Sequence, residues 1–545
     1  MPSVTRDEFV ELVAAARRSA GGAAIAVPVS IRLLSDQLTP VLAYRRLVSA
    51  DERTAPSFLL ESVENQPGSG RSTLGQGRFS ILGARPIVEV LAKDETVTVT
   101  DHRDGSARIE PRTDPFEPMR RFNAGVTLAI PEAARHRGMH PECATGGWIG
   151  YAGYDTVRDA EPEKLDPKNA PTDDRRLPDL AFGFYDAACV FDHAERMVYL
   201  VQLALVSEGD DIEQAYDDAL TKLRERASAI QTHSRPLPSG TVSAHPPARE
   251  LPSNLSRSQY DGMIDRALEY IRAGDIFQVV LGQRFERRSE VDPFDVYRAL
   301  RSVNPSPYMV YLQTPGCILV ASSPEILCRV ERTDAGELMV TNRPLAGTRK
   351  RGATPAQDLA LEEDLLADPK ERSEHVMLVD LGRNDVGVVA QPGTVNLPDV
   401  MAIERYSHVM HISSTVTGIL RQGLDCWDAL RAALPVGTIS GAPKIRAMQI
   451  IDELEPVRRG PYGGGMGWVG LDGQMDIALA LRTIVVPTAD YRPGKKWTYH
   501  IQAAGGIVAD SQHEAEFQET VNKAAAMGRA IDVAEDAFLG KSTND

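Results

Sequence analysis

The sequence has little cysteine and no long hydrophobic run. Its five cysteines are scattered through 545 residues, and no two of them form a C-x-x-C pair. This pattern supports neither a disulfide framework nor a structural zinc site, because both need clustered cysteines. No run of about 18 apolar residues occurs, so we predict no membrane-spanning helix. The N-terminal segment has early acidic residues and no apolar core typical of a secretory signal, so we expect a cytoplasmic protein.

Positive charge is also scarce. The chain has 60 Lys and Arg residues against 76 Asp and Glu residues, a formal net charge of −16. A nucleic-acid-binding surface would be basic, so the composition argues against that partner, although a local basic pocket could still hold a small anion. A hydrophobic content of 42% and a charged content of 25% are ordinary for a globular protein, and the length favours two or three domains.

The clearest predicted boundary is residues 231–256, which are rich in Pro and Ser and lack hydrophobic periodicity. We predict an N-terminal domain over 1–230, a linker or surface excursion over 231–256, a second domain over 257–530 and a tail over 531–545. Short β-like runs fill the first domain, and strands and helices mix in the second without regular alternation. An α+β fold rich in antiparallel strands is therefore predicted rather than a doubly wound sheet.

The stretch "LPVGTISGAPKIRAMQIIDELE" joins a Gly-rich loop to an amphipathic helix. Pro443 suits a first helical turn, and residues 445, 448, 451 and 454 form an apolar stripe. A helix N-terminus attracts anions. The spacing of Gly437, Gly441 and Lys444 does not match the phosphate-binding G-x-x-x-x-G-K-[ST] pattern, which argues against a nucleotide. From this segment alone, an ordinary capped turn and an anion site are equally open.

Two acidic pairs recur at helical spacing. Glu371 and Glu374 share one helix face behind Asp368, a predicted N-cap that Glu371 would complete as a capping box. Glu516 and Glu519 repeat the spacing. Carboxylate oxygens are the ligands that Mg²⁺ prefers. Each pair on its own is more typical of a solvated helix face.

Basic residues and glycines form further candidate features. Arg482 ends an apolar, strand-like run, where an unpaired guanidinium is costly to bury. It therefore needs a carboxylate, and an internal salt bridge is the favoured partner from the strand alone. The Gly clusters at 462–470 and 503–511 indicate either turns or close backbone approach to a ligand.

Taken together, these motifs resemble those of the chorismate-utilising enzymes, in the same order along the chain. The motifs are "RPLAGTR", "DPKERSEHVMLVDLGRNDVG", "YSHVMHISSTVTG", "PVGTISGAPK", "RRGPYGGGMGWV" and "AAGGIVADS" followed by two glutamates and a lysine. The resemblance runs from about 256 to 528, with a weaker match over about 33 to 205, and is greatest to the anthranilate-forming branch. It implies two antiparallel-rich sheets forming a sandwich flanked by helices, with chorismate as substrate and Mg²⁺ as cofactor.

By this resemblance, the two acidic pairs form the metal site. Glu374 and Glu519 would be ligands, Glu371 and Glu516 would support them, and Lys523 would balance charge nearby. Mg²⁺ would hold the ring carboxylate and favour loss of the C4 hydroxyl.

The resemblance also implies a binding set for the organic substrate. Arg482, Tyr462 and the backbone near Gly505 and Gly506 would hold the enolpyruvyl carboxylate, and a bidentate arginine suits that planar group. Thr438 would lend its hydroxyl from the Gly-rich loop.

Two titratable residues match the family's catalytic positions. Glu325, in "SSPEIL", would be the general acid at the leaving hydroxyl, so we expect a desolvated setting that raises its pKa. His411, in "VMHIS", matches the histidine of the later step, in which pyruvate leaves and the ring becomes aromatic. Without the family, a satisfied core histidine would be the commoner interpretation. His408 is given no role.

Two positions separate the branches of the family. Members that add water carry a lysine base where this chain has Gln278, and an amide cannot act as that base. Aminodeoxychorismate synthases typically have a nucleophilic lysine where this chain has Ala346, close to Thr348 in a segment expected to contact substrate. Attack by ammonia followed by loss of pyruvate remains, which gives anthranilate. Aminodeoxychorismate formation and a non-catalytic tryptophan-binding protein are the alternatives.

The resemblance implies an inhibitor and a partner as well. "FLLESVE" matches the family's tryptophan-binding segment, and Glu61, Ser62, Pro305, Tyr308 and Met309 would line the inhibitor pocket. None of the cysteines lies in a glutaminase-type G-x-C-x-G-x-Q elbow. Ammonia from glutamine should therefore need a separate glutamine amidotransferase subunit, in an expected heterotetramer of two large and two small subunits.

Overall fold

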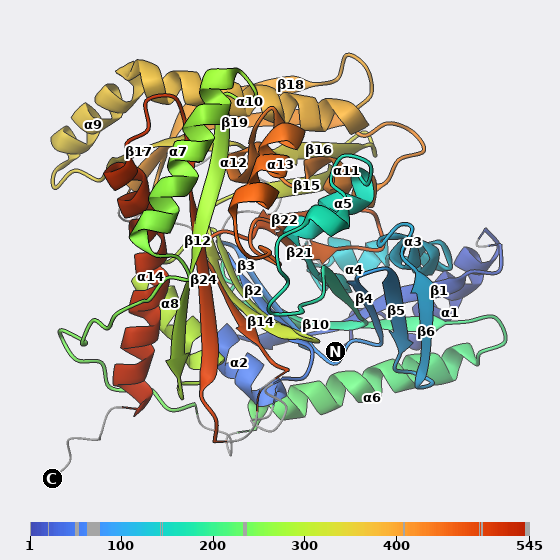
Figure 1. The fold of residues 1–545 in the computed structure, drawn as a ribbon. Coiled ribbons are helices and arrows are strands. Elements are labelled where there is room, and N and C mark those ends of the chain that lie inside the picture. Colours follow the sequence, from blue (N-terminus) through green and yellow to red (C-terminus); the bar gives the residue numbers. More distant parts are fainter. Residues whose placement is uncertain are drawn as a thin grey trace, which may run out of the picture.

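The computed structural model describes residues 2–19, 21–48, 54–62, 77–141, 143, 145–232, 237–406, 409–489, 491 and 494–539. Two large sheets dominate this part of the chain, with helices on their outer faces (Figure 1). The pairing is antiparallel throughout the two sheets except between β1 and β7. The antiparallel-rich α+β fold predicted from the sequence is confirmed.

The first sheet has 12 strands. In spatial order they are β20 (Gly441–Ala442), β12 (Gln278–Ser289), β24 (Trp497–Ile507), β23 (Thr483–Pro487), β14 (Cys317–Ser323), β13 (Tyr308–Thr314), β2 (Ser57–Glu61), β3 (Phe79–Ala84), β10 (Ala187–Asp192), β11 (Met197–Val206), β1 (Ala24–Leu34) and β7 (Val126–Leu128).

The second sheet also has 12 strands. They are β17 (Leu345–Lys350), β19 (Val409–Ile419), β16 (Leu338–Asn342), β15 (Ile326–Arg332), β22 (Met475–Leu479), β21 (Gly465–Val469), β8 (Gly147–Ala152), β9 (Leu180–Tyr185), β4 (Val88–Lys93), β5 (Thr96–Asp101) and β6 (Ser106–Pro111), with β18 (Asn396–Arg405) paired to β19.

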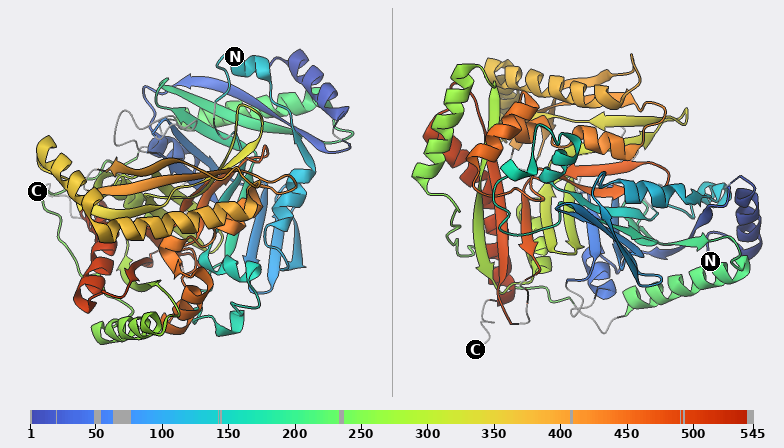
Figure 2. Two further views of the ribbon diagram at one scale, coloured as in Figure 1. Left: turned by 90° about the horizontal axis from the view of Figure 1, so that it is seen from above. Right: turned by 45° about the vertical axis from the view of Figure 1, so that its right-hand side comes forward.

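The helices cover the sheets in groups. In chain order they are α1 (Arg6–Arg17), α2 (Pro40–Leu47), α3 (Glu117–Ala124), α4 (Glu132–His136), α5 (Val157–Ala160), α6 (Ile212–Gln231), α7 (Arg257–Ala273), α8 (Pro293–Val303), α9 (Pro355–Ala367), α10 (Pro369–Val389), α11 (Cys426–Ala433), α12 (Gly437–Ser440), α13 (Lys444–Leu454) and α14 (His513–Leu539). Helices α7, α8 and α14 pack on the first sheet, α9 and α10 lie over β17 and β19, and α6 lies at the opposite end of the molecule (Figures 1 and 2). No helix in the described ranges is long and apolar enough to cross a bilayer.

Both sheets continue across the predicted domain boundary. In the first sheet β13 from the second half of the chain pairs with β2 from the first, with Met309 opposite Glu61. In the second sheet β21 pairs in the same way with β8. The two halves of the chain are therefore joined by backbone hydrogen bonds in both sheets, and the described part of the predicted linker, 237–256, runs along α14, where Ser243 bonds Asp536.

Several local predictions are confirmed. Helix α7 is followed by strand β12, as the mixed strands and helices predicted for the second domain require. The first domain contains the antiparallel hairpin β10–β11, and helix α10 begins after its predicted N-cap, Asp368. On α13, Met448 and Ile451 of the predicted apolar stripe are buried. Pro443 is the N-cap residue of α13 rather than part of its first turn.

Two predictions need correction. The tail predicted from residue 531 begins too early, because Ile531 and Ala534 continue the apolar stripe of α14 and are buried in the core. The capping box of α10 is half formed. Asp368 accepts from the backbone N–H of Glu371, but the side chain of Glu371 accepts from Arg349 (Nη1 to Oε1, 3.2 Å).

Candidate active site

The candidate site lies where the chain crosses between the two sheets. Glu325 is in the turn that leads from β14 in the first sheet to β15 in the second, and Arg482 is in the connection from β22 in the second sheet to β23 in the first. Backbone bonds join the two crossings: Ser322 N–H donates to Arg482 O (3.1 Å) and Leu479 N–H to Glu325 O (3.0 Å). These bonds hold the two crossing segments side by side.

Glu325 is a buried acid with one hydrogen-bond donor. Only 4% of it is exposed, and its Oε1 accepts from the hydroxyl of Thr438 (3.2 Å) on α12. Burial raises the pKa of Glu325 to about 8, which exceeds the lowering effect of the Thr438 bond. The predicted desolvation is therefore confirmed, and at neutral pH this carboxyl carries a proton that it can donate.

Glycine places α12 against α10. A Cβ on Gly437 would lie 2.4 Å from Cδ1 of Leu381, so a larger residue would push α12 and Thr438 away from the acid. Lys444, also expected at the substrate, instead pairs with Asp385 of α10 (Nζ to Oδ1, 2.6 Å).

His411 lies on β19 opposite Thr348 of β17. Its Nδ1 is 2.9 Å from Gly347 O and 3.1 Å from Thr348 Oγ1. Because a carbonyl can only accept, Nδ1 carries the proton and Nε2 has a free lone pair in the neutral ring. Burial lowers the pKa of His411 to about 4, so the ring is neutral and Nε2 can accept a proton.

Arg482 has no carboxylate partner among the described residues, so the salt bridge favoured from the sequence is wrong. Its backbone adopts φ 46°, and burial lowers the pKa of its guanidinium, while Tyr406 acts in the opposite direction. Its charge also contributes to the lowered pKa of His411. A half-buried guanidinium without an internal anion is suited to an anionic ligand.

Helices α10 and α14 bring the acidic pairs together. Burial raises the pKa of Glu374, and repulsion from Glu371 and Glu519 adds to the effect. Burial likewise raises the pKa of Glu516, with Glu519 again adding repulsion. Lys523 pairs with Glu519 (Nζ to Oε1, 2.6 Å). No three His, Cys, Asp or Glu side chains of the described chain are already assembled around one point as a metal cluster.

Glycines in β24 let the neighbouring side chains approach. A Cβ on Gly505 would lie 3.5 Å from Oε2 of Glu516, and one on Gly506 would lie 2.4 Å from Nε2 of Gln278. Gln278 in turn donates to Glu374 (3.5 Å), and its Oε1 is buried without a partner.

Two further predicted substrate residues are buried nearby. Tyr462 is almost fully buried and lies in the segment that leads into β21. Ala346 lies on β17 opposite Ile412, and places no nucleophilic atom there.

A separate cavity matches the predicted inhibitor pocket. Glu61, Ser62, Tyr308 and Met309 line it, but Pro305 does not, since Pro307 occupies that place on the wall. Four residues, Asn304, Pro305, Ser306 and Pro307, separate α8 from β13, so the family motif alone could not show which proline faces the cavity.

The sequence reasoning missed the polar wall of this cavity. Arg329 donates to the hydroxyl of Tyr308 (2.8 Å) and to Asp476 (3.0 Å). These residues lie on β15, β13 and β22. The only sequence signal that could have predicted them is the alternation of polar and apolar residues along these strands. Tyr406, which packs beside His411 (ring centroids 5.6 Å), was missed as well. His408 lies outside the described residues.

Comparison with known proteins gives the class to which this site belongs. Residues 75–529 match the chorismate binding enzyme family, and the chain belongs to that family. Relatives that cover most of the chain are anthranilate synthases. It is 50% identical to anthranilate synthase alpha subunit 1, chloroplastic, of Oryza sativa subsp. indica, over 94% of this chain and 89% of that protein. It is 40% identical to anthranilate synthase component 1 of Acetivibrio thermocellus, over 93% and 96%.

Solved structures agree with this grouping. The crystal structure of anthranilate synthase component I from Streptococcus pneumoniae TIGR4 aligns with a TM-score of 0.66 and 32% identity, over 92% of this chain and 99% of that one. The isochorismate synthase MenF from Escherichia coli aligns with a TM-score of 0.62 and 18% identity, over 96% and 99%, and shares the fold.

Proposed function

We propose that this chain forms anthranilate and pyruvate from chorismate, with ammonia as the nitrogen donor. The observation that carries this proposal is the arrangement of the two segments that cross between the sheets, a region that we call the seam. There a protonated Glu325 and an unpaired Arg482 lie on two crossing segments that are hydrogen-bonded to each other. An acid and a cation in this arrangement suit a substrate that must lose hydroxide while its carboxylates are held.

The residues divide the reaction between them. Arg482 and Tyr462 bind the enolpyruvyl carboxylate. Ammonia bonds to C2 of the ring as the C4–O bond breaks, and Glu325 gives its proton to the departing oxygen, which leaves as water. The ammonium group formed at C2 loses a proton, Nε2 of His411 takes the proton from C2, and the bond from C3 to the enolpyruvyl oxygen breaks as the ring becomes aromatic. The released enolpyruvate takes up a proton at its methylene carbon and becomes pyruvate.

The carboxylates of α10 and α14 fit a divalent cation of the Mg²⁺ type. Their hard oxygen donors match its preference. Burial is the main cause of the raised pKa values of Glu374 and Glu516, and repulsion from Glu519, which a cation would relieve, adds to it. Glu374 and Glu519 would hold it, with Glu371 and Glu516 beside them. When bound, the ion would neutralise the ring carboxylate and make the C4 hydroxyl a better leaving group.

Two side chains support anthranilate over the other products of the family. Gln278 and Ala346 stand where a basic or nucleophilic lysine would serve water addition or aminodeoxychorismate formation. Oε1 of Gln278 is buried and has no hydrogen-bond partner. It can accept a hydrogen bond, but it cannot remove a proton from water. Aminodeoxychorismate formation remains the second candidate.

One assay tests the proposal. Purified chain with chorismate, MgCl₂ and an ammonium salt should give fluorescent anthranilate and an equal amount of pyruvate. Chelation with EDTA should stop the reaction, and excess MgCl₂ should restore it. Glutamine should support turnover only after a glutaminase subunit is added, since the chain has no glutaminase elbow. A non-fluorescent aminated product would refute anthranilate formation, and tryptophan binding without turnover would support a non-catalytic sensor.

The cavity at Glu61 and Ser62 supports feedback inhibition by tryptophan. Apolar walls from Met309, Met466 and Trp468 suit an indole ring. The Glu61 carboxylate, which Tyr297 (2.5 Å) and Arg301 (3.1 Å) hold in the wall, can accept a further bond from an ammonium group. Strand β21 lines this cavity and follows directly after the segment that carries Tyr462. Tryptophan and chorismate should therefore weaken each other's binding reciprocally, and calorimetry showing independent binding would contradict this.

A further inference from the structure

A buried ion pair lies behind the candidate site. Arg459 is 2% exposed, and its guanidinium binds Glu455 through Nε (2.9 Å) and Nη2 (2.6 Å). Its remaining bonds go to backbone carbonyls: Nη1 donates to Ile439 O (2.7 Å) and Nη2 to Val280 O (2.7 Å). The guanidinium also lies over the ring of Tyr154, 4.7 Å from its centroid. An ion pair gains little stability from burial by itself, so its value depends on these additional bonds.

The pair completes the edge of the first sheet. Strand β20 pairs with β12 only at Gln278 and Val279. The next backbone groups on that edge are Val280 O, which accepts from Arg459, and Gly282 N–H, which donates to Glu455 (2.8 Å). At these two backbone groups, side chains thus continue the hydrogen bonding that a longer β20 would supply.

Each segment bound by Arg459 carries a candidate site residue. Ile439 is next to Thr438, the donor to the acid. Val280 is two residues from Gln278, and Arg459 itself is three residues before Tyr462. One guanidinium therefore ties α12, β12 and the segment before β21 to one another. Its planar fork reaches both carbonyls and the carboxylate at once, which a lysine ammonium cannot do with the same geometry.

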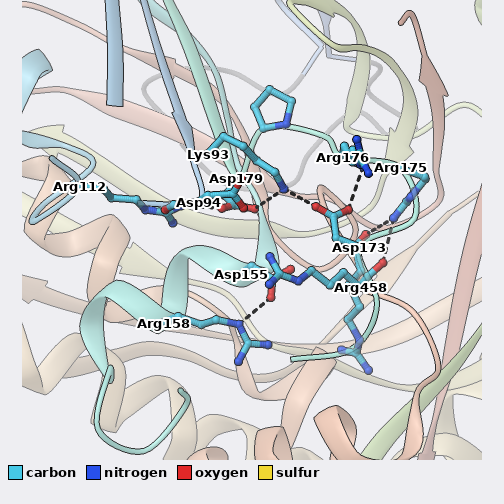
Figure 3. A network of polar contacts seen from close by, with 12 residues as sticks. Lys93, Asp94, Arg112, Asp155, Arg158, Asp173, Arg175, Arg176, Asp179 and Arg458 are labelled. Carbon is cyan, nitrogen blue, oxygen red and sulfur yellow. Dashed lines mark hydrogen bonds and ion pairs between the residues drawn. The ribbon is translucent and has the colours of Figure 1, made fainter. Parts of the chain in front are cut away.

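The first half of the chain holds the outer side of the same segment. Figure 3 shows Arg175 directed at the backbone beside Arg458, where its Nη2 donates to Arg458 O (3.0 Å) and Arg459 O (2.9 Å). Arg458 N–H donates to Thr172 O (3.0 Å), and Tyr154 N–H donates to Gly460 O (2.9 Å). These bonds fix the backbone of Arg459, so its side chain reaches the carbonyls of α12 and β12 from a defined position.

We propose that Arg459, supported by Glu455, is a positioning residue that sets the placement of Thr438, Gln278 and Tyr462 in the reaction proposed above. The inference rests on that proposed function. Arg459 does not touch substrate; it acts through the backbone of the three segments.

Arg459→Lys tests this role. Loss of the fork should lower kcat about 100-fold, since displacements of about 1 Å have effects of that size, with a smaller change in KM. The matched control is Arg287→Lys. Arg287 lies on β12, the strand whose Val280 carbonyl Arg459 binds, and its guanidinium binds Asp532 and Glu535 of α14 (both 3.0 Å), away from the site. The Arg287→Lys variant should therefore lose stability without this loss in kcat.

A double-mutant cycle separates positioning from stability. Thr438→Val should lower kcat about tenfold in the wild-type and Arg287→Lys backgrounds, and less than about threefold in the Arg459→Lys background, where the hydroxyl is already misplaced. Glu455→Gln is the second variant if Arg459→Lys does not fold. It keeps an acceptor for Gly282 and weakens the hold on Arg459, and it should reduce the Thr438 effect in the same way.

The outcomes are distinguishable. An undiminished tenfold effect of Thr438→Val in the Arg459 and Glu455 variants overturns the positioning role. Absence of anthranilate from the wild-type protein refutes the proposed function instead. The positioning role is then decided by amide hydrogen exchange at 437–441, which Arg459→Lys should accelerate and Arg287→Lys should not. Equal exchange in the two variants would overturn it.

Discussion

Replacing Glu325 by glutamine should make the protein more resistant to alkaline unfolding while it inactivates the enzyme. Burial raises the pKa of this acid from 4.5 to about 8. The folded protein therefore keeps a proton that the unfolded chain loses between these values. Since the unfolded state then binds fewer protons, wild-type stability falls as the pH rises from about 4.5 to about 8. The glutamine side chain does not titrate, so the variant lacks this loss.

The size of the effect follows from the same shift. Each pKa unit corresponds to about 1.4 kcal/mol, so between pH 5 and pH 9 wild type should lose about 4 kcal/mol relative to Glu325→Gln. The amide also lowers the free energy of unfolding, because its N–H groups need new acceptors. This loss is the same at both pH values and cancels in the comparison. Activity should fall about 10²- to 10⁴-fold, because the amide cannot protonate the leaving hydroxyl.

Urea unfolding of both proteins at pH 5 and pH 9 measures the difference, and anthranilate fluorescence measures activity. Thr438→Val serves as the control. It removes the bond to Glu325, which lowers the pKa of that acid, but leaves the acid itself, so its stability should fall with pH at least as steeply as that of wild type. A stability difference between wild type and Glu325→Gln that does not change with pH would refute the argument that this carboxyl is buried with its proton.

Three other outcomes follow from the site. Arg482→Lys should raise KM for chorismate at least tenfold, because the ammonium lacks the bidentate fork, and an unchanged KM in steady-state kinetics would place the carboxylate elsewhere. Glu519→Gln should raise the Mg²⁺ concentration needed for half-maximal activity about tenfold, whereas the neighbouring exposed Gln518→Ala should not; equal titration curves would remove Glu519 from the ligand set. Ser62→Leu should weaken tryptophan inhibition without changing kcat, and inhibition curves that coincide with wild type would show that the cavity is not the inhibitor site.

Local signals in the sequence were enough for much of the fold. Helix α10 begins at Asp368 and Pro369 because an N-cap side chain and a proline suit its first turn, and β12 follows from a run of apolar residues. The exact partners of the charged groups were not predictable. Glu371 bonds Arg349 rather than its own helix end, and that arginine lies 22 residues earlier in the sequence, on another element.

The family motifs predicted which residues belong to the candidate site better than they predicted the burial and the partners of those residues. The burial of Glu325 follows from a short turn between two strands that are buried along most of their length. The lack of a carboxylate beside Arg482 depends on which segments of both sheets meet at the seam, and no single stretch of sequence contains that information. The same applies to Arg459, whose two backbone acceptors, Ile439 O and Val280 O, lie 20 and 179 residues away in the sequence. The expected cytoplasmic location and the heterotetramer remain predictions.

The continuity of both sheets from one half of the chain to the other has a practical consequence for dissecting this protein. A cut near residue 235 would expose β13 and β21 on one fragment and β2 and β8 on the other, each as a bare strand with unsatisfied amides and carbonyls. Such strands recruit other chains. The proposed inhibition by tryptophan should therefore be tested by point substitution in the cavity, since a chain without its first half would be prone to aggregate before it could be assayed.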